Sequence, residues 1–190
     1  MRQTYCRTQS DICRQCRTEK QYITRKTAAF VYADAAKRAV LTFKKERNAG
    51  NADTLADYIA QMVRTDFKGI EFDYVVSVPP RKKNFTDENY DQAARLARAV
   101  SLKISVPYLK GVMQQTSKIR KQSTLSYSDR ARNVKGKFAV VKPSYIKNKT
   151  LLIIDDVCTS GSTLNECGRV LKDSGAYRIY AATLTTVPGI

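Results

Sequence analysis

The sequence predicts an α/β domain with a largely parallel sheet flanked by helices, preceded by a small cysteine-bearing module. Apolar, often β-branched runs recur at "AAFVY", "FDYVVSV", "TLLIIDDV" and "YRIYAATLTTV", and amphipathic segments lie between them. The runs are nearly continuous rather than alternating with polar residues, which is typical of parallel strands buried on both faces. A chain of 190 residues is long enough for one such domain with a sizeable core.

The first elements of the expected domain are a short strand at 28–32 and a helix over 33–48. Gly50 interrupts the helical pattern, and Asp53 is expected to cap a second helix over 54–65. The apolar residues that share one face of the first helix are Ala36, Val40, Leu41 and Phe43.

A strand over 72–78 ends at a Pro-Pro pair, and an amphipathic helix follows over 89–101. The residues of this helix that are expected to face the core are Ala93, Leu96, Ala97 and Val100. A short extended piece over 105–112 leads into a stretch with almost no apolar periodicity. That stretch, about 111–137, is predicted to be a long loop, and loops of this length are commonly functional or mobile.

The last third of the chain is expected to supply the centre of the sheet. Strands are predicted at 137–141 and 150–157, a helix from about Thr163 to Asp173, and a final strand at 177–187. Strand, helix and strand in this order form a parallel crossover unit.

Residues 1–26 are polar and basic with little periodicity, so we expect a module separate from the domain at 27–190. Five cysteines is an odd number, and Cys158 and Cys167 lie far from the others, which indicates reduced thiols rather than a disulfide framework. The N-terminus lacks the apolar centre of a signal peptide, and no apolar run approaches the roughly 20 residues of a membrane span. A cytoplasmic protein without membrane insertion is therefore expected.

The net charge is strongly positive. The chain has 34 Lys and Arg against 17 Asp and Glu and no histidine, which leaves +17. Such an excess favours polyanionic partners, either nucleic acid or a phosphate-rich small molecule, although a basic surface that only aids solubility has the same composition. The absence of histidine excludes Ser-His hydrolysis and most histidine-ligated metal sites.

The stretch "LLIIDDVCTSGST" combines a buried strand, two acids and a turn rich in hydroxyl groups. Gly161 allows the backbone to turn tightly, and the start of the following helix adds partial positive charge, so the turn is suited to a phosphate monoester. Asp155 and Asp156 accept hydrogen bonds and therefore need hydroxyl donors or a metal. A sugar phosphate satisfies both needs; the alternative is that the acids are solvated and the turn only caps a helix.

The same stretch resembles the phosphoribosyl-diphosphate (PRPP) binding motif of type I phosphoribosyltransferases, which implies that fold. The resemblance implies that Asp155 and Asp156 hold the ribose 2- and 3-hydroxyls, and that PRPP binds with Mg²⁺ carried mainly by the diphosphate. The residues implied to hold the 5-phosphate are Thr159, Ser160, Gly161, Ser162 and Thr163.

From about Phe30 onward, the order and spacing of "YVVSVPPRKKNF", "NYDQAARLAR" and "KQSTLSYSDRARNVKGKF" are similar to the competence protein F (ComF) family. This resemblance implies a role in natural competence and a zinc module at the N-terminus formed by Cys6, Cys13 and Cys16. Structural zinc takes four ligands, so a set of three is either incomplete, shared with a partner, or shortened by truncation.

The stretch "SVPPRKK" lies where these enzymes have their pyrophosphate loop. The residues implied are Ser77, Val78, Pro79, Pro80 and Arg81. X-Pro bonds reach the cis form more easily than others, which suits a loop whose amides must face a diphosphate; a strand ended by prolines beside a solvated basic cluster is the alternative. ComF relatives usually continue with Arg-Gly-Phe-Asn, whereas this chain has "NFTDENYDQ".

The basic stretch at 111–137 aligns with the mobile loop that closes over PRPP in phosphoribosyltransferases. Lys118, Arg120 and Lys121 are each candidates for neutralising the departing pyrophosphate. Arg130, together with Asn133, instead resembles a structural latch. Binding of a nucleic-acid backbone is a third reading.

The leading hypothesis is a ComF-like phosphoribosyltransferase that binds Mg-PRPP, transfers the phosphoribosyl group to an unidentified acceptor, and acts in DNA uptake. The alternative is a non-catalytic adaptor that binds single-stranded DNA or another DNA-uptake protein. Nucleobase salvage is a weaker alternative, because the chain ends directly after its last strand, where such enzymes can carry a hood over the base.

Overall fold

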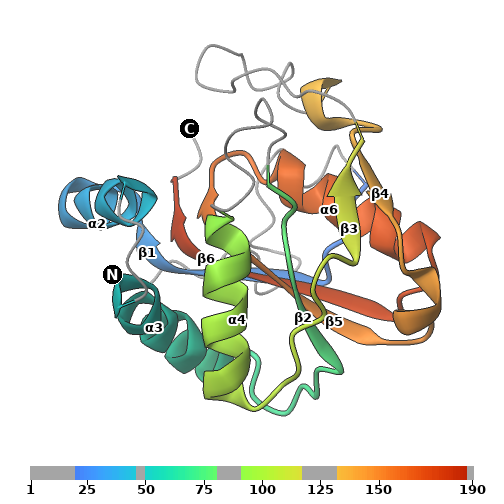
Figure 1. Ribbon diagram of the computed structural model, residues 1–190, viewed down its shortest axis with the longest axis horizontal. Helices are drawn as coiled ribbons and strands as arrows, with labels where there is room; N and C mark the ends of the chain where they lie inside the picture. Colours follow the sequence, from blue (N-terminus) through green and yellow to red (C-terminus); the bar gives the residue numbers. More distant parts are fainter. Residues whose placement is uncertain (1–19, 46–49, 81–90, 117–131, 188–190) are drawn as a thin grey trace.

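The computed structural model describes residues 20–45, 50–80, 91–116 and 132–187. Its strands and helices follow each other in the order shown in Figure 1. The elements are β1 (Arg25–Val31), α2 (Asp34–Lys45), α3 (Gly50–Asp66), β2 (Tyr74–Ser77), α4 (Gln92–Ile104), β3 (Met113–Gln115), β4 (Phe138–Val140), a 3₁₀ turn (Pro143–Tyr145), β5 (Thr150–Cys158), α6 (Ser162–Asp173) and β6 (Arg178–Thr186).

Within the described residues, the main sheet has four parallel strands in the order β1-β6-β5-β2. In β5 the residues Leu151 to Ile154 are fully buried, and Ile179 to Thr186 of β6 are buried as well. Because both faces of these strands are covered, Leu151 to Ile154 of β5 and Ile179 to Ala182 of β6 form continuous, mainly apolar runs. The predicted α/β architecture with a parallel sheet is confirmed.

Helices cover the two faces of the sheet unequally. The helices α2, α3 and α4 cover one face and share a core with Leu152 and Ile154 of β5. On the other face α6 and the β3–β4 pair share a second core with Leu151 and Ile153. Successive β5 side chains therefore enter opposite cores, and each fully buried Leu or Ile contributes roughly 1.5–3 kcal/mol of burial free energy.

The helix α4 confirms its predicted inward face. Its buried residues include Ala93, Leu96, Ala97 and Val100. Asp91 is the N-cap and accepts a hydrogen bond from the Ala94 amide at 2.9 Å, so the helix begins three residues later than predicted. Within the described part of the chain, no helix combines the length and apolar character needed to cross a bilayer.

Two expectations about α2 and α3 are wrong. Asp53 lies in the first turn of α3 and is not its cap, because the helix already begins at Gly50; its carboxylate instead contacts Lys103 at 3.1 Å. In α2, Val40 and Phe43 are buried but Leu41 is 42% exposed. The helix buries only a narrow stripe, and Leu41 lies about 100° around the axis from Val40.

The start of the stretch predicted to be a loop over 111–137 is a strand. Met113 pairs with Val140 and Gln115 with Phe138 in the antiparallel β3–β4 ribbon. Met113 and Gln115 are buried while Gln114 is exposed, so a strand alternation exists. A buried glutamine conceals that alternation from any reading based on hydrophobicity.

Residues 20–24 pack against the main domain ahead of β1. Asn165 of α6 accepts a hydrogen bond from the Tyr22 amide and donates one to the Lys20 carbonyl. A Cβ on Gly168 would lie 2.7 Å from Ile23 Cδ1, so a larger residue here would require the Ile23 side chain to shift. Residues 20–26, which precede the expected domain boundary at 26/27, therefore pack in the same unit as the residues of β1 that follow it.

One hydrogen-bonded carboxylate joins the starts of β2 and β5. Asp73 accepts hydrogen bonds from the Thr150 amide and from Lys149 Nζ, both at 2.8 Å. These bonds, the one from Lys149 first, lower the pKa of Asp73 below its usual value. The ionised form is thereby favoured in the folded state.

We expect Asp73→Asn to lower the melting temperature by roughly 2–4 °C at neutral pH, because the amide replaces a charged acceptor. The folded-state pKa of Asp73 is lowered, so its contribution is complete above the unfolded pKa near about 4 and is lost as pH falls through the folded value. Wild type and variant should therefore converge in thermal melts below about pH 4. A difference that persists unchanged at pH 2.5 would contradict this account.

Candidate functional site

The two acids of the motif lie at the carboxyl end of β5. Asp155 and Asp156 are both half-buried, and the Asp156 amide donates to Asp155 Oδ1 at 2.8 Å. Asp155 is paired with Thr183 of the neighbouring strand β6. In open parallel sheets this edge is where ligands bind. The structure thus places both acids where the sequence predicts them.

The turn that follows has the geometry of an anion cradle. Gly161 adopts the left-handed conformation, with φ 75°, and is the N-cap of α6 without a capping side chain. Ser160 and Ser162 hydroxyls lie 3.0 Å apart, and the first turn of α6 contains no acidic residue. The positive end of the helix is therefore not neutralised from within its own first turn, which favours an anionic ligand.

Sequence reasoning missed the hydroxyl groups that β6 brings to this edge. Thr183, Thr185 and Thr186 are buried beside the end of β5. Thr185 Oγ1 donates to the Asp156 carbonyl at 3.4 Å, and so helps to fix the backbone that carries the acids. The repeated threonines in "TLTT", at the end of the last predicted strand, were the sequence signal for hydroxyl groups at this edge.

A second residue that sequence reasoning missed is Lys26 of β1. Its Nζ lies 2.9 Å from the position that a Cβ on Gly161 would occupy. No spacing in the sequence connects this lysine with the motif, because the sheet topology alone brings them together.

Two free thiols lie behind the turn. Cys158 and Cys167 are buried, and burial raises the pKa of both. A thiol with a raised pKa stays protonated at neutral pH and is a poor nucleophile. Both cysteines are free thiols, as the sequence indicates.

The expected pyrophosphate loop begins at the same sheet edge. β2 ends at Ser77, whose hydroxyl lies 3.0 Å from Tyr108 Oη. The Val78 amide donates to the Ile154 carbonyl at 3.1 Å, so it belongs to the sheet. Every peptide bond in the described residues is trans, including those before Pro79 and Pro80, so the cis geometry considered from the sequence is not present.

Several predicted site residues lie outside the described residues, and their roles remain predictions. They are Cys6, Cys13, Cys16, Arg81, Lys118, Arg120, Lys121 and Arg130. In the part of the chain that is described, no group of three or more Cys, Asp or Glu is arranged to hold a metal ion.

Residues 134–136, shortly before β4, are anchored to the core and to α6. Val134 is buried in the core, and the Gly136 amide donates to Glu166 Oε1 at 2.7 Å. Glu166 is itself buried and accepts two hydrogen bonds from Arg169. These contacts raise the pKa of Arg169, with the Glu166 hydrogen bond as the largest cause. These contacts attach residues 134–136 to α6, while the latch predicted at Arg130 and Asn133 stays a prediction.

We expect Glu166→Gln to destabilise the protein by roughly 1–3 kcal/mol, because a neutral amide leaves the partly buried Arg169 without its main charge partner. Asp173→Asn is the matched control. It removes the exposed carboxylate that contacts the same arginine at 2.7 Å, and it should change stability by less than about 0.5 kcal/mol. Urea unfolding measures both variants. Equal effects would contradict the assigned importance of the buried contact.

Comparisons with known proteins agree with this geometry. A family model described as "Phosphoribosyl transferase domain" matches residues 90–189. The chain is 32% identical over 91 residues to competence protein F of Haemophilus influenzae, covering 47% of this chain and 40% of that protein. It is 29% identical over 104 residues to the DNA utilization protein YhgH of Escherichia coli, covering 55% of this chain and 45% of that protein. The chain therefore spans less than half the length of these relatives.

A crystal structure of adenine phosphoribosyltransferase superposes with a TM-score of 0.51 at 15% identity, covering 75% of this chain and 73% of that one. This likeness shows the type I phosphoribosyltransferase fold that the motif implied, and the expected resemblance to the competence protein F family is confirmed. Because the family model matches more than half of this chain, the chain belongs to the phosphoribosyltransferase domain family.

Proposed function

We propose that this chain binds PRPP with Mg²⁺ at the carboxyl edge of β5 and acts in DNA uptake. The observation that carries the proposal is the placement of Asp155 and Asp156 immediately before a turn whose Gly161 is left-handed and uncapped. Carboxylates serve as acceptors for sugar hydroxyls, and the turn serves a phosphate, so one sugar phosphate engages both.

Each part of the proposed ligand has a matching group on the chain. Asp155 and Asp156 would accept hydrogen bonds from the ribose hydroxyls, and Ser160 and Ser162 would donate to the 5-phosphate. Ser77, at the end of β2, lies on the side proposed for the diphosphate. Magnesium on the diphosphate would lower the charge of the leaving group, and the two half-exposed acids are oxygen ligands of the kind it prefers.

The proposed reaction is phosphoribosyl transfer. The bond between C1 of the ribose and the diphosphate oxygen breaks, the pyrophosphate departs with the electron pair, and a nucleophile on the acceptor forms the new bond to C1. The chain's own contribution would be to hold the ribose at both ends, so that C1 is presented in a fixed orientation. Exclusion of water from C1 would fall to the basic stretch at 111–137.

A role in DNA uptake is supported by relatives named competence protein F and DNA utilization protein. Their likeness to this chain extends over 91 and 104 residues, and the matched phosphoribosyltransferase domain, residues 90–189, contains the proposed PRPP site. We therefore infer that this chain both binds PRPP and acts in DNA uptake.

The double substitution Asp155→Asn and Asp156→Asn tests the site. We expect binding of Mg-PRPP and of ribose 5-phosphate to weaken at least about 10-fold, since each neutral amide is a weaker acceptor for a hydroxyl. Binding of inorganic phosphate should stay unchanged or tighten, because negative charge near the cradle is removed. Calorimetry measures all three, and release of pyrophosphate with candidate acceptors tests transfer.

Comparing the three ligands distinguishes the loss of the carboxylate contacts from a general disturbance of the site. If all three ligands bind less tightly, the substitutions have disturbed the turn. If ribose 5-phosphate and PRPP bind as to wild type, the assignment of the acids fails. Asp57→Asn on the surface of α3 is a control that removes an acid remote from the edge of β5.

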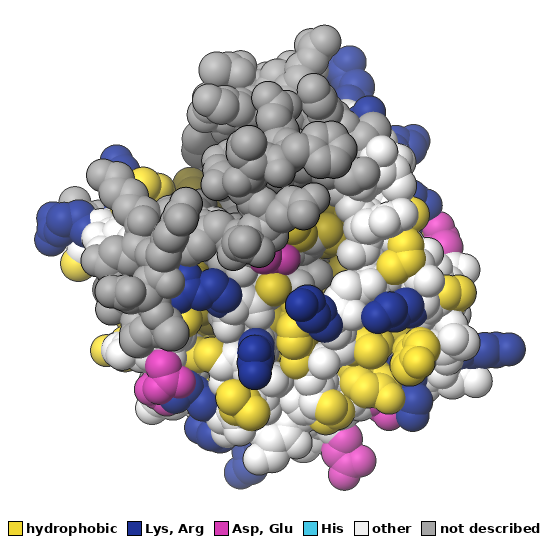
Figure 2. Space-filling view, in the orientation of Figure 1, with side chains coloured by type: hydrophobic (Ala, Val, Ile, Leu, Met, Phe, Trp, Pro, Cys, Tyr) yellow, Lys and Arg dark blue, Asp and Glu magenta, His cyan; other side chains and the backbone are white. Residues whose placement is uncertain are grey.

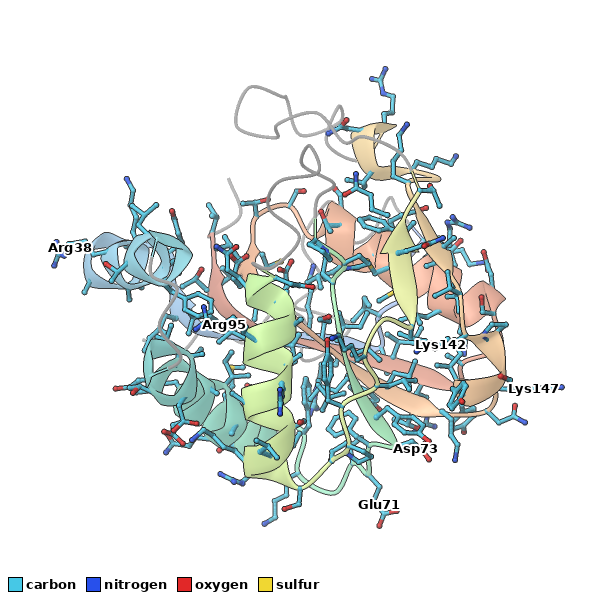
Figure 3. The ribbon with its side chains drawn as sticks, in the orientation of Figure 1. Arg38, Glu71, Asp73, Arg95, Lys142 and Lys147 are labelled. Atoms are coloured by element: carbon cyan, nitrogen blue, oxygen red, sulfur yellow. The ribbon has the colours of Figure 1, made fainter. Side chains whose placement is uncertain are left out.

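A second candidate function, binding of single-stranded DNA, is favoured by a basic groove beside α4. The groove is lined by Arg98, Ser101, Leu102, Ser105, Val106, Pro107, Tyr108 and Lys110, with no acid among them. Lys142 reaches the Lys110 carbonyl at 3.2 Å, and Arg95 lies one turn before Arg98 on the same helix. Lys and Arg side chains are spread across the face that carries α4 (Figure 2), and Arg95 and Lys142 are labelled on it in Figure 3.

We expect Arg98→Gln with Lys110→Gln to weaken binding of a short single strand and to reduce the slope of log K against log salt by about 1.4, for two lost phosphate contacts. The matched control is Arg38→Gln with Lys147→Gln, which lowers the net charge equally at two positions away from the groove (Figure 3). Fluorescence anisotropy at several salt concentrations measures both. Equal losses in the two variants would show that only net charge matters.

A further inference from the structure

The strand β1 brings a lysine to the phosphate cradle from outside the motif. Its side chains alternate between the two faces of the sheet. Arg25 lies over the Phe67 ring at 4.9 Å, and Thr27 donates to Asp66 Oδ2 at 2.6 Å, so both point toward α3. Lys26, between them, therefore points to the opposite face, which α6 covers.

The ammonium of Lys26 lies against the turn that begins α6. A Cβ placed on Gly161 would be only 2.9 Å from Lys26 Nζ and 3.8 Å from Cys158 Sγ. Any residue other than glycine would thus push the lysine away, in addition to opposing the left-handed backbone. The positive charge of Lys26 also acts on the buried Cys158 thiol, where it lowers the pKa against the larger effect of burial.

This lysine has no counter-ion in the described structure. Lys26 is half-buried, and among the described residues its side chain makes no ion pair and no hydrogen bond. The ion pairs of the described cations lie elsewhere, for example Lys149 with Asp73 and Arg169 with Glu166. A partly buried cation beside an uncapped helix N-terminus makes the turn strongly attractive to an anion.

We propose that Lys26 is a phosphate-positioning residue of the site, which supplies the charge that the amides and hydroxyls of the turn lack. The inference rests on the proposed function and adds a specificity to it. Amide and hydroxyl donors serve monoanions and dianions alike, whereas a fixed cation favours a dianion such as a phosphate monoester over a carboxylate. Lys26 would thereby offset the repulsion that Asp155 and Asp156 exert on the same phosphate.

The test compares Lys26→Met and Lys26→Arg with wild type by calorimetry, using ribose 5-phosphate, Mg-PRPP and pyrophosphate. We expect Lys26→Met to weaken ribose 5-phosphate and Mg-PRPP about 10- to 100-fold, as for a lost charge-assisted contact. Lys26→Arg should recover most of the affinity, and pyrophosphate binding should change less than about 3-fold. Lys147→Met, an exposed lysine (Figure 3), controls for the lower net charge.

The outcomes separate this inference from the proposed function. If wild type binds Mg-PRPP and Lys26→Met binds it equally well, the inference fails and the proposed function stands. If wild type binds neither Mg-PRPP nor ribose 5-phosphate, both fail. A purely structural role predicts a lower melting temperature with all three ligands weakened alike, and this result would also overturn the inference.

Discussion

The central constraint on this molecule is the burial of β5 between β6 and β2. Its residues Leu151 to Ile154 are fully buried on both faces, and the strand continues directly into two acids. Because its neighbours run parallel to it, their carboxyl ends arrive at the same edge. The parallel order of the strands therefore suffices to place three groups at the edge that carries the acids: the threonines of β6, Ser77 of β2 and the turn before α6.

The parts of the site that are contiguous in sequence were predictable, and those assembled across strands were not. The acids and the turn at Thr159–Thr163 follow from one local pattern, as does the parallel sheet. Lys26 and Thr185 reach the site only through strand order, which a single sequence does not encode locally. Gln115 conceals a strand because a polar residue is buried, and Leu41 was misplaced because α2 buries a stripe narrower than its apolar pattern.

The proposed site and the basic groove share a point of contact. Tyr108 lines the groove, and its hydroxyl lies 3.0 Å from that of Ser77 at the end of β2. Burial raises the pKa of Tyr108, so the phenol remains neutral and is able to serve as either donor or acceptor. Ser77, at the expected pyrophosphate loop, and Tyr108, which lines the groove, are thus joined by one hydrogen bond.

The pairing of β1 with β6 governs the order in which the chain completes its fold. Arg25 pairs with Tyr180 and Val31 with Thr186, so an early strand forms its ladder with the last one. Such pairing has a high contact order, and its loop-closure entropy must be overcome before the edge strand gains any contact. During synthesis β1 therefore cannot form this ladder until β6 has emerged, and Lys26 reaches its place beside the cradle only with that pairing. Assembly of the phosphate site then coincides with closure of the whole sheet.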